Sequence, residues 1–172
     1  HCYATPISRP RQPCFEGTTI LAALAASTRR VRVACLMFAL PLRHPAQLAR
    51  AIATIDHLSQ GRVEMGLGAG WVAEDFTDFG IPFLPLKERL QQLEEGLAII
   101  RSLYDDEQTT YRGRFYSLDR AECRPKPMQT RLPLWVGGTG KSQTPRLAAL
   151  YADGINLPFV SPADCRERNG TL

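Results

Sequence analysis

Short apolar segments alternate with longer helical patterns along the whole chain, and this alternation restricts the possible folds more than any other feature. The apolar segments are rich in Val, Ile and Leu, which is typical of strands buried on both faces of a parallel sheet. Parallel strands joined by helices form right-handed crossovers. We expect strands at residues 30–40, 62–70, 133–138 and 153–160, and helices at 15–28, 44–61, 86–104 and 145–152.

Two α/β architectures contain such repeats: an open doubly wound sheet and a segment of a (β/α)8 barrel. A full barrel needs eight strands in about 250 residues, whereas this chain of 172 residues shows four. Four strands can form a complete open sheet, while half a barrel leaves two unpaired edges. The pattern of residues alone therefore leaves both architectures open.

One long segment, residues 105–133, interrupts the alternation. It is polar, basic and proline-bearing, and we expect a surface excursion with a small hairpin around residues 112–114. Glu94 and Glu95 are expected on an exposed face of the preceding helix. The pair Asp56-His57 is expected to provide capping and surface polarity near the end of its own helix.

Composition indicates one globular domain and argues against several classes of protein. The chain is 44% hydrophobic and 22% charged, and it has no run of 18 apolar residues and no early apolar stretch of signal-peptide length. Five scattered cysteines without a C-x-x-C pair favour a reducing, cytoplasmic compartment and argue against a disulfide framework or a zinc site; we expect no metal. The net charge of +4 comes from dispersed arginines, so we expect no nucleic-acid partner.

The segment "LWVGGTGKSQT" looks like a triphosphate-binding loop, but its spacing excludes that reading. The G-x-x-x-x-G-K-[ST] pattern needs a glycine five positions before Gly140, and Trp135 stands there. A strand, glycines and a helix start with Pro145 in its first turn still form an anion site, because free amides and the helix dipole point at the gap.

A second glycine segment, "GLGAGW", follows the strand at 62–70 and resembles a dinucleotide fingerprint. The pattern G-x-G-x-x-G fails because its last position is Trp71, and a loop intervenes before the next helix. In parallel α/β sheets ligands bind at the carboxyl ends of strands. Both glycine segments and "ALPLRH" lie at such ends, so the sequence predicts a cofactor site there. Within "ALPLRH", His44 fits three roles: a helix cap, a ligand contact, or an acid or base.

Seven segments together resemble the luciferase-like monooxygenase superfamily, in its branch of deazaflavin (coenzyme F420)-dependent oxidoreductases. They are TTILAALAASTRRVRV, RHPAQLARAIATIDHLSQGRVEMGLGAGW, FGIPF, ERLQQLEEGLAIIRSLY, YRGRFYSL, PKPMQ and PLWVGGTGKSQTPRLAALYADGINL, in the family's order from Phe15 to Pro158. The resemblance implies a partial TIM barrel, about strands 3 to 6 with their helices. Residues 1–172 would then be a single domain that is incomplete at both ends, in keeping with the start at His1 and the helix-like end "CRERNGTL".

The resemblance also implies where the coenzyme binds. Gly137, Gly138, Thr139 and Gly140 would hold its phosphate, assisted by Lys141 or Ser142. Gly68, Gly70 and Trp71 would line the pocket near the ring, and residues 37–40 would lie beneath it. The catalytic candidates are His44 and His1, of which His1 resembles the histidine of an Asp-His pair in the family.

The function that the resemblance implies is hydride transfer between coenzyme F420 and a small organic substrate by a homo-oligomeric enzyme. The first alternative is a monooxygenase that uses FMN, consumes oxygen and receives reduced flavin from a partner reductase. The second alternative is a non-catalytic half barrel that acts as an assembly module. Trp71 stands where some dehydrogenase relatives carry a glutamate, which argues against a specific alcohol or sugar-phosphate dehydrogenase.

Overall fold

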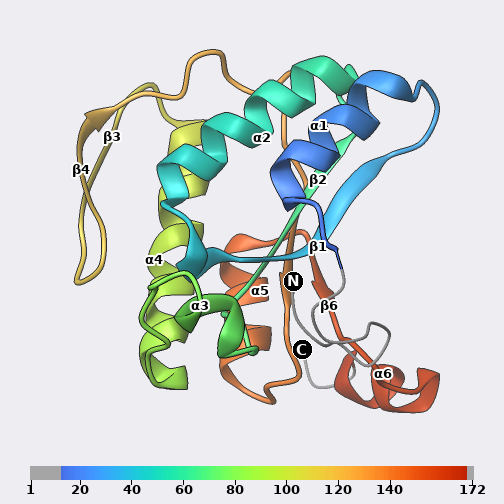
Figure 1. Cartoon of the computed structure of the whole chain (residues 1–172), viewed down its shortest axis with the longest axis vertical. Helices are drawn as coiled ribbons and strands as arrows, with labels where there is room; N and C mark the ends of the chain where they lie inside the picture. Colours follow the sequence, from blue (N-terminus) through green and yellow to red (C-terminus); the bar gives the residue numbers. More distant parts are fainter. Residues whose placement is uncertain (1–12, 170–172) are drawn as a thin grey trace.

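A computed structural model describes residues 13–169 of the chain. Its centre is a parallel sheet of four strands in the order β1-β2-β5-β6 (Figure 1). The strands are β1 (Val33–Ala39), β2 (Val63–Gly68), β5 (Leu134–Gly137) and β6 (Gly154–Asn156). The helices are α1 (Gly17–Ser27), α2 (Pro45–Ser59), α3 (Glu74–Thr77), α4 (Leu86–Asp105), α5 (Gln143–Tyr151) and α6 (Pro162–Asn169), with a short 3-10 helix at Leu40–Leu42. The four predicted strands and four predicted helices are confirmed.

Four helices form one continuous layer against the sheet, because α1 packs on α2, α2 on α4, and α4 on α5. The apolar residues of β2, Val63, Met65 and Leu67, point into this layer and are fully buried. Leu134 and Val136 of β5 do the same. Since side chains alternate along a strand, the intervening residues lie on the opposite face. That face carries Gly66, Gly68 and Gly137 and is called the glycine face below.

The edge strand β1 is irregular where it faces the glycines. Its pairing with β2 shifts between Cys35 and Phe38, and the peptide bond between Leu36 and Met37 is cis. Both of these side chains lie over the glycine face, because a Cβ atom at Gly66 would stand 2.5 Å from Met37 Sδ and 2.7 Å from Leu36 Cδ2. Phe38 follows on the helix side, where it is buried against α1.

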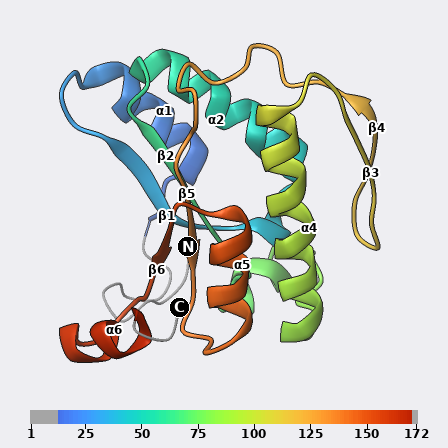
Figure 2. The ribbon, with the colours of Figure 1, turned by 180° about the vertical axis from the view of Figure 1, so that it is seen from behind.

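The predicted hairpin is present and lies beside α4, away from the sheet (Figures 1 and 2). It consists of β3 (Thr109–Arg112) and β4 (Ser117–Ala121). The prediction that Glu94 and Glu95 merely face solvent was wrong. Glu95 accepts hydrogen bonds from the backbone amides of the hairpin turn, at 2.9 Å from Arg114, 3.0 Å from Phe115 and 3.1 Å from Tyr116. Glu94 forms an ion pair with Arg146 of α5 at 2.6 Å.

Asp56 also differs from the prediction, because its side chain is fully buried rather than part of a polar surface. Its carboxylate accepts the backbone amide of Gln129 at 3.0 Å and the side-chain amide of the same residue at 2.8 Å. The Nε2 atom of the neighbouring His57 lies 2.8 Å from the carbonyl of Lys126. These two side chains therefore fasten the segment that follows the hairpin to the end of α2.

Several boundaries move relative to the prediction. The loop expected after Gly70 contains one helical turn, α3, and α5 begins two residues before Pro145. The last strand shortens to the three residues Gly154–Asn156. The helix expected to begin near the end of the chain starts already at Pro162. Gln60, with φ of 56°, ends α2 ahead of the expected stop at Gly61.

No helix within residues 13–169 is both long enough and apolar enough to cross a bilayer. The same residues contain no group of three or more His, Cys, Asp or Glu side chains arranged to hold a metal ion. Cys14, Cys35, Cys123 and Cys165 are free thiols.

Replacing Asp56 by alanine is expected to lower the free energy of unfolding by about 2–3 kcal/mol, because two partly buried donors of Gln129 lose their buried, charged acceptor. Urea denaturation followed by circular dichroism measures the change. Asp119→Ala is the control, since Asp119 forms only an exposed ion pair with Arg112 at 3.4 Å and its loss is expected to cost less than about 0.5 kcal/mol. Equal effects of the two substitutions would contradict the role given to Asp56.

Candidate functional site

The carboxyl ends of the four parallel strands meet in one row. Ala39 pairs with Gly68, Gly68 with Gly137, and Gly137 with Asn156. The structure thus brings together the strand ends that the sequence analysis selected. Three of the four positions carry a hydrogen or a methyl group as side chain, so the backbone at this edge is nearly bare. Ligands in parallel α/β folds bind at this edge.

The floor beside this row is apolar and is formed by Met37. A Cβ atom at Gly137 would stand 2.5 Å from Met37 Cγ, so the glycines of β2 and β5 make room for the methionine side chain. Met37 is half-buried, and the neighbouring Leu36 is 56% exposed. Of the stretch 37–40 that was expected beneath a coenzyme ring, Phe38 and Leu40 instead point into the helical layer. Met37 is the large side chain of that stretch on the glycine face.

The opposite end of the glycine face is closed by polar contacts. The indole Nε1 of Trp135 donates to Glu64 at 2.7 Å, and Arg32 forms an ion pair with the same carboxylate. The indole ring also covers Gly154, the residue of β6 that pairs with Trp135, because a Cβ atom at Gly154 would stand 2.3 Å from Trp135 Cζ3. A ligand is therefore accommodated toward the carboxyl ends of the strands and not toward their amino ends.

The loop after β2 contains Gly70, and only glycine fits at that position. Its φ is +75°, and a Cβ atom would stand 2.6 Å from Phe76 Cζ. Trp71 follows with 57% of its surface exposed. An apolar wall formed by Trp71 stays a prediction.

Arg89 of α4 fixes this loop and was not predicted from the sequence. The buried guanidinium donates to the carbonyls of Leu84 at 2.8 Å and Ala69 at 3.2 Å, and also to that of Gly70. It stacks on the ring of Phe83 at 4.0 Å. Burial lowers the pKa of Arg89. One side chain thereby ties the two ends of a long loop to each other.

The segment 138–142 connects β5 to α5 as a turn, as the sequence analysis predicted. Gly138 donates its amide to the carbonyl of Asn156 at 3.2 Å, while Thr139, Gly140, Lys141 and Ser142 are exposed. Ser142 is the N-cap residue of α5 and its side chain makes no capping hydrogen bond. The first amides of a helix have no partner within the helix. The start of α5 therefore presents its first amides and the positive end of a helix dipole beside the glycine row.

His44 is the N-cap residue of α2, which is one of the three roles that the sequence left open. Its Nδ1 accepts the amide of Ala46 at 3.3 Å, and its ring meets that of Tyr116 edge-on at 5.6 Å between centroids. Burial and the carboxylate of Glu95 raise the pKa of Tyr116 to about 12, so this phenol stays neutral near neutral pH. Both contacts of His44 are with the helical layer and the hairpin. An acid or base role for His44 stays a prediction, and His1 lies outside the described residues.

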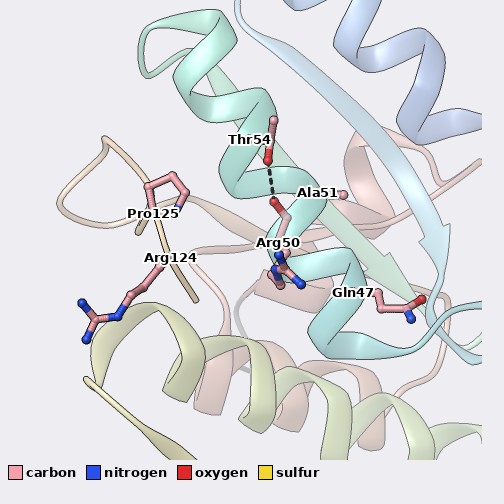
Figure 3. A pocket seen from close by; sticks show the side chains of 6 residues that line it. All are labelled: Gln47, Arg50, Ala51, Thr54, Arg124 and Pro125. Atoms are coloured by element: carbon pink, nitrogen blue, oxygen red, sulfur yellow. Dashed lines mark hydrogen bonds between the residues drawn. The ribbon is translucent and has the colours of Figure 1, made fainter. Parts of the chain in front are cut away.

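A separate pocket of about 290 Å³ lies on the outer side of α2 (Figure 3). Gln47, Arg50, Ala51 and Thr54 of α2 line it together with Arg124 and Pro125. The hydroxyl of Thr54 donates to the carbonyl of Arg50 at 3.0 Å, and the side chain of Arg124 pairs with Glu122. Since α2 belongs to the layer on the other side of the sheet from the glycine face, this pocket is not part of the candidate site.

Comparison with known proteins gives relatives that share a large part of this chain. An uncharacterised protein of Mycobacterium tuberculosis is 40% identical over 135 residues, which are 78% of this chain and 46% of that protein. An F420-dependent glucose-6-phosphate dehydrogenase of Beutenbergia cavernae is 37% identical over 136 residues, 78% of this chain and 40% of the relative. An FMNH(2)-dependent dimethylsulfone monooxygenase of Pseudomonas fluorescens is 31% identical over 127 residues, 74% of this chain and 34% of the relative. The chain thus spans half or less of the length of each.

Solved structures agree with the predicted fold. The monooxygenase RslO1 from Streptomyces bottropensis superposes with a TM-score of 0.75 at 30% identity, over 88% of this chain and 45% of that one. An F420-dependent secondary alcohol dehydrogenase superposes with a TM-score of 0.77 at 23% identity, over 91% of this chain and 50% of that one, which shows the fold alone. Both are luciferase-like TIM barrels, and the predicted class, an α/β partial barrel, is confirmed. Because the family model for luciferase-like monooxygenases matches residues 3–169, the chain belongs to that family.

Proposed function

We propose that this protein is an oxidoreductase that binds a deazaflavin, coenzyme F420, at the carboxyl ends of β1, β2 and β5 and transfers hydride to or from a small organic substrate. The observation that carries the proposal is the row Ala39–Gly68–Gly137–Asn156, with Met37 on one side and the glycine turn on the other. A planar ring needs a flat apolar support, and its phosphate needs amide donors. Both occur side by side here.

The residues of the site fit such a coenzyme. Met37 and Leu36 supply apolar surface for a ring, and no side chain projects from Gly68 or Gly137 to obstruct it. Gly138 and Thr139 bring the chain past the site, and Gly140 and the start of α5 offer amides to a phosphate, with Lys141 or Ser142 beside them. Trp71 is exposed and follows the part of the loop that Arg89 fixes, so its indole would supply an apolar wall for the ring.

The chemistry of hydride transfer is supplied by the coenzyme when it is bound, and the protein contributes binding, orientation and exclusion of water. Met37 and the glycine row orient the ring, and the turn 138–142 fixes the position of the phosphate. His44 stands at the start of α2 as a candidate to exchange a proton with the substrate, through the nitrogen that does not cap the helix.

The relatives favour this class of reaction but include two coenzymes. The F420-dependent glucose-6-phosphate dehydrogenases support the deazaflavin, and the FMNH(2)-dependent dimethylsulfone monooxygenase supports FMN as the second candidate. In the FMN case the protein would consume oxygen and draw reduced flavin from a reductase. A small-molecule substrate and a homo-oligomeric, cytoplasmic enzyme belong to the same proposal.

Titration with oxidised F420 and with FMN, followed by fluorescence, tests the proposal directly. We expect saturable binding of F420 at micromolar concentration and weaker binding of FMN. Reduced coenzyme is then mixed with the protein in an oxygen electrode, where a reduced deazaflavin reacts poorly with oxygen. Rapid oxygen uptake with reduced FMN would transfer the protein to the monooxygenase class. Absence of binding by either coenzyme would overturn the proposal in favour of a non-catalytic half barrel.

Gly137→Ala is expected to weaken coenzyme binding at least about tenfold, or about 1.4 kcal/mol, because the added methyl group displaces Met37 from beneath the ring. The dissociation constant from fluorescence titration measures the effect, and the melting temperature checks that the variant folds. Ala149→Ser on the exposed side of α5 is the control and leaves affinity unchanged. An unchanged affinity in Gly137→Ala would remove this glycine from the site.

Arg89→Met is expected to raise the dissociation constant about tenfold as well, because three loop carbonyls lose their common donor and Trp71 loses its fixed position. Limited proteolysis within residues 71–85 reports the loosened loop independently of the coenzyme. Lys87→Met, at an exposed position one turn or less away on the same helix, is the matched control. If Arg89→Met and Lys87→Met bind coenzyme equally, Arg89 serves stability only.

A further inference from the structure

The pocket on the outer side of α2, called the α2 pocket below, lies outside the candidate site and matches no sequence motif. One face of α2 forms its inner wall, through residues three, four and seven positions after the first: Gln47, Arg50, Ala51 and Thr54. Arg124 and Pro125 form the facing wall (Figure 3). Since Ala51 is short, a hollow opens between the longer side chains. Its volume of about 290 Å³ is close to that of pockets for small organic molecules, which begin at roughly 300 Å³.

The lining of the α2 pocket carries two guanidinium groups and no carboxylate. Arg50 is exposed, and within residues 13–169 its guanidinium forms no hydrogen bond and no ion pair. Its charge nevertheless reaches the facing wall. Burial raises the pKa of Cys123, the residue before Arg124, and the positive charges of Lys126 and Arg50 oppose this rise. Arg50 therefore contributes a positive charge to the pocket that no carboxylate of the described residues neutralises.

The second guanidinium, that of Arg124, keeps donors available for a ligand. Its Nε atom pairs with the carboxylate of Glu122, while its two terminal nitrogens form no further hydrogen bond in the part of the chain that the structure describes. The side chain is 75% exposed, so it is free to turn toward the pocket. Lys126 donates to two backbone carbonyls at the end of α4, which do not cancel its charge. Arg50, Arg124 and Lys126 thus share one carboxylate partner among the described residues, and positive charge is left over at the pocket.

We propose that the α2 pocket binds a small organic anion with two acidic groups, of the dicarboxylate type. One acidic group pairs with Arg50 and the other with Arg124, because the guanidinium fork binds a carboxylate through two parallel hydrogen bonds. Ala51 and Pro125 supply apolar surface for the carbon atoms between the two groups. The hydroxyl of Thr54 already donates to the carbonyl of Arg50 at 3.0 Å, so the arginines are the donors to the anion. The inference is independent of the proposed coenzyme site, which lies on the other side of the sheet.

Titration of the 15N-labelled protein with succinate, followed by NMR, tests the inference. We expect saturable shifts of the backbone amides of residues 47–54 and of Arg124, with a dissociation constant on the order of 1 mM, because exposed charge pairs are individually weak. Acetate, with one carboxylate, is expected to bind at least about fivefold more weakly, and the uncharged succinamide is expected to cause no shift. Acetate binding as tightly as succinate, or shifts caused by succinamide, would overturn the inference.

Three variants separate a built site from general attraction to a basic protein. Arg50→Met is expected to weaken succinate binding at least about tenfold, because a charged pair of hydrogen bonds is lost. Arg124→Met is expected to lower the affinity for succinate to that for acetate. Arg166→Met is the matched control: it removes the same charge on α6, which lies far from α2 (Figures 1 and 2), and leaves the affinity unchanged. Equal losses in Arg50→Met and Arg166→Met, or no loss in Arg50→Met, contradict the inference.

Inorganic phosphate and thermal melting complete the test. Phosphate that binds as tightly as succinate and depends on Arg50 alone would mean a site for a single oxyanion, which contradicts a ligand with two acidic groups. Succinate is expected to raise the melting temperature of the parent protein and not that of Arg50→Met. Should Arg50→Met unfold, Arg50→Lys provides the comparison, since it keeps the charge and lacks the fork, and we expect about threefold weaker binding. Unchanged binding in Arg50→Lys would rule out the fork as the ligand.

Discussion

The alternation of side chains along β2 and β5 is the constraint on which the rest of the structure depends. Val63, Met65, Leu67, Leu134 and Val136 are all fully buried against the helices, and each contributes about 1.5–3 kcal/mol through burial. A slip of one residue in either strand would turn this whole set toward the other face. The core therefore fixes the register, and the register fixes where the glycines lie. The bare edge of the candidate site is a consequence of how the core packs.

The sequence predicts those parts of the molecule that repeat along the chain. The apolar strands, the helical patterns and the glycines at strand ends are local signals, and the structure confirms the elements that they indicate. The resemblance to a family was needed to choose the barrel over the open sheet, because four β/α repeats are common to both. The glycine turn was predicted from a strand followed by glycines and a helix start, and its position beside the end of β6 follows from parallel pairing.

Contacts between distant segments could not be predicted in this way. From the sequence, Asp56 looks like an ordinary polar residue near a helix end. Its partner Gln129, however, lies 73 positions later in the chain. Glu95 resembles any surface carboxylate until the hairpin turn, 19 to 21 residues away, folds back over it. Arg89 did carry a signal, because it falls on the same stripe of α4 as the buried Leu93 and Leu97. A cation on an apolar stripe needs acceptors from elsewhere in the fold, and here the loop carbonyls provide them.

The nature of the phosphate site bears on the choice of coenzyme. The turn 138–142 offers amides and a helix dipole, and the one cation within it is the exposed Lys141. A single positive charge balances a phosphodiester, which carries one negative charge, more completely than a phosphate monoester, which carries nearly two at neutral pH. Burying the uncompensated part of the charge is costly, so a site built from neutral donors favours the singly charged ligand. A deazaflavin joined through a diester meets this requirement better than FMN does, which supports the deazaflavin as the first candidate.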